Sequence, residues 1–156
     1  MRRISALIAS LAFAGLVSAT SATAQDASIV GSWITESWEG QDDTQPGLLI
    51  FTETNYSMMF VIPGMARERY AGEAMTDAET LAAFNTIVAN SGRYTRDGNE
   101  ITTEGYVTLD PNYMANWGEN HLTYTFEVDG DTLRLTWPDG FLNEADGFTG
   151  TFRKVG

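Results

Sequence analysis

Apolar and polar residues alternate along most of the chain beyond residue 29, which is the pattern of β-strands with one buried face. The alternation is clearest between residues 121 and 137, where two such runs flank Asp129-Gly130-Asp131. An Asp-Gly pair between alternating runs is typical of a tight hairpin turn. We therefore predict a hairpin here. Its buried face would carry the apolar residues of the alternation, which are Leu122, Tyr124, Phe126, Val128, Leu133, Leu135 and Trp137.

Tight turns and long connections alternate along the chain. Residues 53–55 and 97–99 have the same turn chemistry as 129–131. The other predicted strands are 31–38, 48–52, 56–62, 93–96, 101–109 and 148–154. In an antiparallel meander, successive connections lie at opposite ends of the sheet. All long connections therefore fall at one end, and they are 39–47, 63–91, 110–120 and 138–147. Because closure removes exposed sheet edges, we predict an all-β fold, an eight-stranded antiparallel up-and-down barrel with a floor of tight turns and an open mouth.

One segment departs from the strand pattern. Thr76 and Glu79 have the spacing of a capping box, in which each side chain accepts a hydrogen bond from the other's backbone N–H. Leu81, Phe84 and Val88 follow at helical spacing, and Gly92 is a stop signal. We predict one short amphipathic helix, roughly 77–90, at the open end of the barrel.

The amino terminus has the order of features of an export signal. Arg2 and Arg3 precede an apolar run over 4–17, and Ala22-Thr23-Ala24 provides a small-x-small cleavage site. The run is too short for a membrane anchor, which needs about 20 apolar residues. The chain has no Cys, so a lipid-modified cysteine is excluded. We predict a cleavable signal peptide over 1–24, a barrel domain over 25–156, and a periplasmic or secreted location.

Charge and composition narrow the range of partners. The formal net charge is −12, so the surface repels phosphate backbones and anionic lipid, which argues against binding to nucleic acid or to a membrane surface. Without Cys there are no disulfides, and with one His a zinc site is not expected. The acidic turns lack the ligand spacing of a calcium loop. We predict neither metal nor cofactor.

Several motifs resemble those of the bacterial lipocalin-like domain family. Gly31-Ser32-Trp33 resembles the Gly-x-Trp signature of lipocalins, and Arg153 lies where lipocalins often place an arginine over that tryptophan. The other matching segments are 47–52, 91–94, 110–113 and 130–135. The resemblance implies a lipocalin-like barrel and small-molecule binding, with structural roles for Gly31, Trp33 and Arg153. The family often carries histidine in the fifth strand and arginine in the sixth, where this chain has Thr103-Glu104 and Tyr124-Thr125.

A barrel of this size can be filled by side chains or can hold one small ligand. Two further features concern the mouth and the first strand. Arg67, in the third long connection, could pair with a ligand carboxylate. If Trp33 points inward, Trp38 points outward unless the strand is bulged.

The predicted ligand-binding residues are Met58, Phe60, Tyr94, Leu122, Tyr124, Phe126, Leu135 and Trp137 inside the barrel, with Trp117 and Arg67 at the mouth. Ile50 and Val107 are expected inside as well.

Three functions are compatible with this pattern. The first is binding of a small apolar or amphipathic molecule inside the barrel. The second is an isomerase or hydrolase acting on a lipid-like substrate, in which Glu104, His121 or Tyr94 would transfer protons. The third is a protein-interaction role for the Trp and Tyr residues of the mouth. The sequence contains no nucleophile-elbow motif, which favours the first function over the second.

Overall fold

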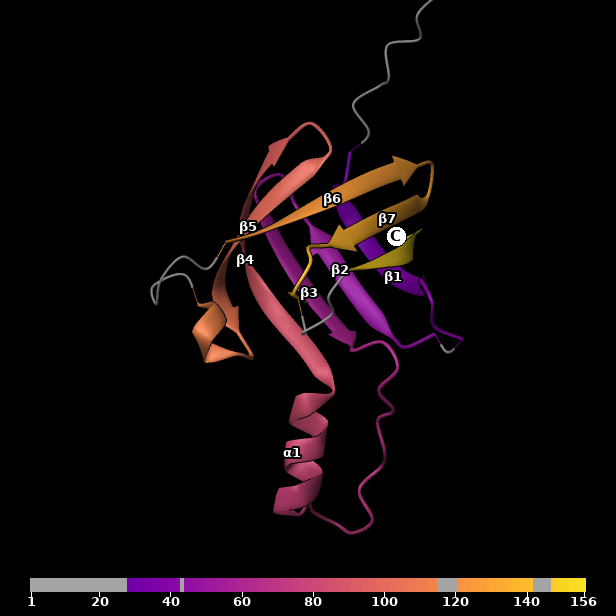
Figure 1. Cartoon of the computed structure of the whole chain (residues 1–156), viewed down its shortest axis with the longest axis vertical. Coiled ribbons are helices and arrows are strands. Elements are labelled where there is room, and N and C mark those ends of the chain that lie inside the picture. The colour runs from indigo at the N-terminus through magenta and orange to yellow at the C-terminus, as the bar shows by residue number, and fades with distance from the viewer. Residues whose placement is uncertain (1–27, 43, 115–120, 142–146) are drawn as a thin grey trace, which may run out of the picture.

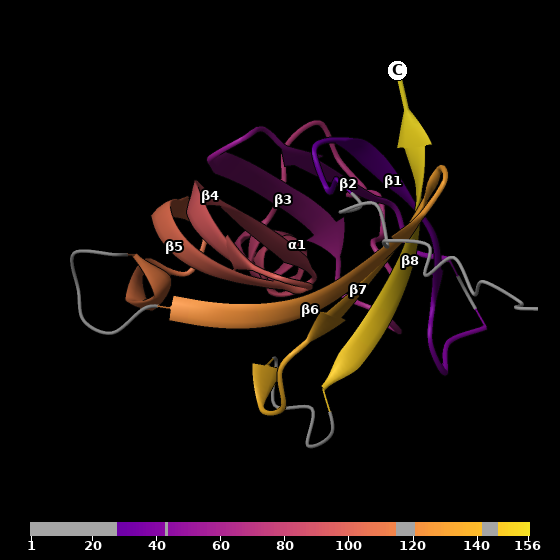
Figure 2. The same ribbon diagram turned by 90° about the horizontal axis from the view of Figure 1, so that it is seen from above.

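The computed structural model describes residues 28–42, 44–114, 121–141 and 147–156. Eight strands follow one another around a closed barrel, each paired with its neighbours in sequence (Figures 1 and 2). The strands are β1 (Gly31–Trp38), β2 (Gly47–Phe51), β3 (Asn55–Val61), β4 (Ile87–Asp97), β5 (Glu100–Thr108), β6 (His121–Asp129), β7 (Thr132–Trp137) and β8 (Phe148–Val155). An α-helix, α1 (Asp77–Asn85), precedes β4, and a 3₁₀ turn, η1 (Pro111–Tyr113), follows β5. The predicted up-and-down barrel is confirmed.

The barrel closes because β1 pairs with both β2 and β8. Trp33 lies opposite Leu49 on one side and opposite Lys154 on the other. All pairs are antiparallel, and the three tight turns lie at the end opposite the long connections, as predicted. Gly98 and Gly130 occupy left-handed positions in two of these turns, with φ of 59° and 57°, where a side chain would add strain.

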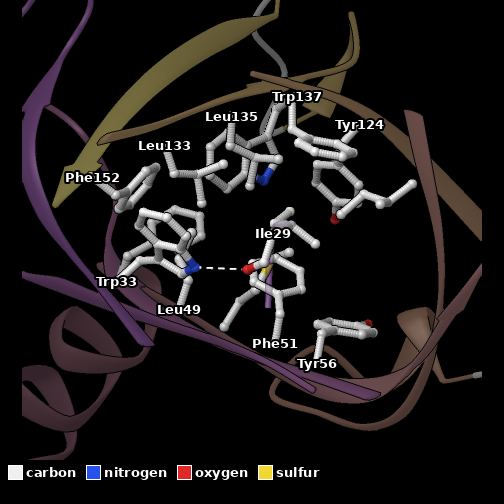
Figure 3. Packing of buried hydrophobic residues seen from close by; sticks show 14 of the residues in the cluster. Ile29, Trp33, Leu49, Phe51, Tyr56, Tyr124, Leu133, Leu135, Trp137 and Phe152 are labelled. Carbon is white, nitrogen blue, oxygen red and sulfur yellow. Dashed lines mark hydrogen bonds between the residues drawn. The ribbon is translucent and has the colours of Figure 1, made fainter. Parts of the chain in front are cut away.

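The residues just before β1 seal the floor of the barrel. Ile29 is 1% exposed and belongs to the core. The indole Nε1 of Trp33 donates a hydrogen bond to the Ile29 carbonyl at 2.8 Å, which fixes this segment across the tight-turn end (Figure 3). Ile29 and Trp33 therefore close part of the core at the floor end.

The interior below the mouth is filled by side chains. Aromatic and aliphatic residues from every strand meet there, so the space has the close packing of a protein core. The most deeply buried are Trp33, Leu49, Phe51, Met58, Phe60, Ile101, Tyr124, Leu133, Leu135, Trp137 and Phe152. Two residues expected inside are outside: Ile50 is 38% exposed and Val107 is 70% exposed.

Two strands contain a register shift that decides which side chains point inward. In β1 the register shifts between Thr35 and Ser37, so both Trp33 and Trp38 point inward, and the bulge alternative is confirmed. In β5, Ser91 and Gly92 of the neighbouring strand pair with Val107 and Gly105, which leaves one extra residue and turns Val107 outward.

The helix begins where predicted but ends earlier. Thr76 and Glu79 form the reciprocal capping box. The chain then enters β4 at Ile87, so Val88 lies on a strand and the predicted range of 77–90 was too long. No residue of α1 is buried, and Leu81 and Phe84 are 61% and 47% exposed, because the helix extends beyond the mouth (Figure 1). No helix in the described part of the chain is long and apolar enough to cross a bilayer.

Candidate functional site

One side of the mouth is packed with aromatic rings. Trp38 and Phe60 have ring centroids 5.2 Å apart, as do Phe60 and Trp137. Trp137 stacks on Phe148 at 4.8 Å, and Phe152 meets Trp38 edge-on at 5.4 Å. These rings come from β1, β3, β7 and β8 and pack that side of the mouth with aromatic contacts.

The other side of the mouth is open and contains a cavity of about 570 Å³. Small-molecule sites in proteins commonly occupy about 300–1,000 Å³. The wall comes from β4, the end of β5 with η1, the start of β6 and the connection after β7, and the end of α1 contributes to the rim. Its main apolar members are Val88, Leu109, Leu122, Phe84 and Phe141.

The inner wall of this cavity carries neutral polar groups. Asn90 is 6% exposed, and its Oδ1 has no hydrogen-bond partner among the described residues. The Tyr113 and Thr103 hydroxyls are 3.0 Å apart, and Thr103 also donates to the Leu122 carbonyl at 3.2 Å. An unpaired buried acceptor is costly, so Asn90 is available to a donor that enters the cavity.

Three tyrosines surround Thr103 below the cavity. Burial raises the pKa of Tyr56, Tyr113 and Tyr124, and the proximity of Tyr113 contributes to the increase at Tyr56 and Tyr124. The hydroxyls of Tyr56 and Tyr124 make no hydrogen bond of normal geometry in the part of the chain that is described, although Thr103 is close enough to lower both pKa values slightly. All three phenols are therefore neutral at physiological pH.

Comparison with known proteins identifies the family of this barrel. The family model described as the lipocalin-like domain matches residues 17–153. The chain belongs to the lipocalin-like domain family. Among solved structures, a lipocalin-like protein from Bacteroides uniformis shares 19% identity, with 81% of this chain and 97% of that chain covered and a TM-score of 0.43. An uncharacterized protein from Bacteroides eggerthii shares 14% identity, with 81% and 98% covered and a TM-score of 0.43. No curated protein matches the chain.

In this lipocalin-like barrel, most of the predicted ligand-binding residues belong to the core. Leu122 lines the mouth cavity. Tyr94 donates its hydroxyl proton to the Thr52 carbonyl at 2.7 Å, at the floor end. Trp117 lies outside the described residues. The others are between 0% and 3% exposed and do not line the cavity, namely Met58, Phe60, Tyr124, Phe126, Leu135 and Trp137.

Arg67 lies apart from the mouth cavity. Its guanidinium donates to the Ala83 carbonyl at 3.1 Å and to the Thr86 Oγ1 at 3.3 Å. Both acceptors are at the carboxyl end of α1, where a cation is also favoured by the helix dipole. The contacts of Arg67 therefore fix the end of the helix against the preceding connection.

The residues considered for proton transfer do not meet inside the barrel, because Glu104 and His121 are cross-strand neighbours on the outer surface whereas Tyr94 lies inside. Glu104 forms an ion pair with the exposed Arg93 on the outer surface. His121 is its exposed neighbour on β6. Tyr94 lies inside the barrel near the floor. No two of them share the cavity, and in the described ranges no group of three or more His, Cys, Asp or Glu side chains could hold a metal ion.

The cation over Trp33 is Lys154, and the prediction for Arg153 was wrong. Lys154 Nζ lies 5.3 Å from the centroid of the Trp33 ring. Arg153 points outward and pairs with Glu36 at 3.3 Å. Strand parity explains the difference, because Phe152 faces inward and only the residue two positions later shares its face.

Sequence reasoning missed Asn90 as a cavity residue because it fell in a segment assigned to the helix. The signal was present in the inward parity of β4, which runs from Tyr94 through Gly92 to Asn90 and Val88. Once the strand is extended back to Ile87, Asn90 is the polar member of an otherwise buried face.

Proposed function

We propose that this lipocalin-like protein binds one small apolar or amphipathic molecule in the cavity at the barrel mouth, outside the cytoplasm. The observation that carries the proposal is the cavity of about 570 Å³ between β4, β5, η1 and β6. Its walls are largely apolar, and its base rests on the solid core. A ligand would therefore sit at the mouth rather than along the barrel axis.

The physical basis is the removal of apolar surface from water. Val88, Leu122 and Phe141 line the cavity and are only partly buried although they pack against the core. A ligand that covers them gains roughly 25 cal/mol for each Å² of apolar area buried. The filled interior supports this gain, because close-packed walls need little rearrangement when the ligand arrives.

A matched pair of tryptophan substitutions tests the location of the site. Leu122→Trp would place a bulky side chain in the cavity, whereas Val107→Trp places the same side chain on the outer surface, where the native residue is 70% exposed. We expect Leu122→Trp to weaken the uptake of Nile red, a neutral fluorescent dye, and Val107→Trp to leave it unchanged. Equal uptake by both variants, with unchanged melting temperatures, would place the dye elsewhere and refute the mouth site.

Export is supported by the order of Arg2, Arg3, the apolar run and Ala22-Thr23-Ala24. The absence of Cys also fits a domain that is held together by its core outside the cytoplasm. The measurement is the intact mass of protein recovered from the periplasm of an expressing bacterium. Cleavage after residue 24 is expected, and an uncleaved chain confined to the cytoplasm would refute export.

A further inference from the structure

The most buried residue of the cavity wall is Asn90, and its chemistry restricts what can bind. The other residues that line the cavity are partly or fully exposed, whereas Asn90 is 6% exposed. It lies on β4 opposite Met58 of β3 and Thr108 of β5, so both neighbouring strands enclose its side chain. Asn90 therefore lies where the cavity ends and the packed core begins.

The unpaired atom of Asn90 is an acceptor. Its Oδ1 is buried without a hydrogen-bond partner among the described residues. A carbonyl oxygen can be satisfied only by an N–H or O–H group. Leaving such a group unpaired costs about 1–3 kcal/mol, so a ligand that brings a donor recovers this cost, and a ligand without one does not.

The charges around the cavity also disfavour an anionic ligand. Asp110 and Asp139 are the ionisable acids of the described wall, and no Lys, Arg or His of the described residues joins them. Arg67, the cation that the sequence placed at the mouth, is held by the end of α1. An anionic head group would meet two carboxylates without a compensating cation, which disfavours fatty-acid anions.

We propose that the mouth cavity selects neutral amphiphiles that carry an O–H or N–H donor at the polar end, with Asn90 as the residue that determines this specificity. The polar end enters first and donates to Asn90 Oδ1, while the apolar tail lies against Val88, Leu122 and Phe141. This inference rests on the proposed function, because it assigns the ligand class of the same cavity.

Three probes that share an eight-carbon chain test the inference, namely octanol, its methyl ether and octanoate, each measured by displacement of Nile red. Octanol has a donor, the ether has none, and octanoate adds a negative charge. We expect octanol to bind about tenfold more tightly than the ether, which corresponds to recovery of one buried hydrogen bond. Octanoate at neutral pH should bind more weakly than octanol.

Variants connect the preference to Asn90. Asn90→Leu removes the acceptor at similar volume, so octanol and the ether should bind equally. Asn90→Asp keeps an acceptor and should retain the preference, which also provides a second reading if the leucine variant folds poorly. Asn99→Leu, at an exposed position in the floor turn, is the control and should behave like the wild type.

The outcomes separate this inference from the function on which it rests. Equal binding of octanol and the ether to the wild type would overturn the donor requirement and leave the mouth site standing. A preference that persists in Asn90→Leu would overturn the role of Asn90. If Nile red and all three probes fail to bind, the proposed function fails, and the inference fails with it.

Discussion

Two buried tyrosines differ in a way that predicts opposite effects of the same substitution. Tyr94 is 8% exposed and donates to the Thr52 carbonyl at 2.7 Å. Tyr124 is 0% exposed, and its hydroxyl makes no hydrogen bond of normal geometry among the described residues, although the Tyr113 and Thr103 hydroxyls lie close to it. Replacing each with phenylalanine removes one oxygen and changes the packing little. The two variants therefore isolate the energetics of the hydroxyl groups.

The expected magnitudes follow from hydrogen-bond energetics. Tyr94→Phe removes the hydrogen bond to the Thr52 carbonyl, which should lower the free energy of unfolding by about 1 kcal/mol. Tyr124→Phe removes a buried, unpaired hydroxyl, which should raise the free energy of unfolding by about 1 kcal/mol. For a urea dependence of about 2 kcal/mol per molar, the midpoints should move by roughly 0.5 M in opposite directions.

Equilibrium urea unfolding, followed by tryptophan fluorescence, measures both shifts. Tyr70→Phe is the control, because Tyr70 is 51% exposed and the change should be close to neutral. If Tyr124→Phe lowers the midpoint as much as Tyr94→Phe does, the Tyr124 hydroxyl has a partner in solution. The reasoning about an unpaired group would then be refuted.

Three further predictions concern stability. Because burial raises the pKa of Tyr56 above the ordinary 10.0, the folded state holds this proton more tightly than the unfolded state. Stability should therefore be full below about pH 10 and fall at higher pH, and Tyr56→Phe should flatten the fall in alkaline thermal melts. Lys154→Met should cost about 0.5–1 kcal/mol by removing the cation over Trp33, whereas Arg153→Met should cost less, and equal losses in thermal melts would contradict this contact. Gly92→Ala would bring a Cβ within 1.9 Å of a backbone carbonyl of β5, so a loss of about 3 kcal/mol in urea unfolding is expected, and a neutral result would show that the strands can separate there.

The sequence predicted the parts of the fold that local chemistry decides. Asp129-Gly130-Asp131 and the alternation on both sides of it define a hairpin wherever they occur, and the structure contains it. The capping box of Thr76 and Glu79 is also local, and it forms as predicted. The order of tight and long connections then left few arrangements other than a closed meander.

The errors arose where neighbouring strands decide the outcome. The run Leu48-Leu49-Ile50-Phe51 is apolar throughout, so its parity could not be assigned from sequence, and Leu49 and Phe51 are the inward pair. Val107 was misplaced because the bulge before it depends on Gly92 across the strand pair. Val88 fits helical spacing, but pairing with Phe60 places it on β4.

The site was predicted only in part for a related reason. The alternation along a strand indicates which side chains point inward, but it does not show where they fill the interior and where a cavity remains. The aromatic rings of Trp38, Phe60 and Trp137 occupy one side of the mouth, and the remaining volume falls beside Asn90 and Leu122. Volume is a property of the assembled barrel, so it appears only in the three-dimensional structure.

The seal that Ile29 and Trp33 make across the floor has a consequence for how such a protein can diversify. Because the packed floor end and interior maintain the fold, the residues that line the proposed ligand cavity are largely a separate set around the rim. If the proposed site is correct, substitutions at the rim would alter ligand preference with little loss of thermodynamic stability. This barrel is therefore a suitable scaffold for directed evolution, in which mouth residues are randomised while the floor is left intact.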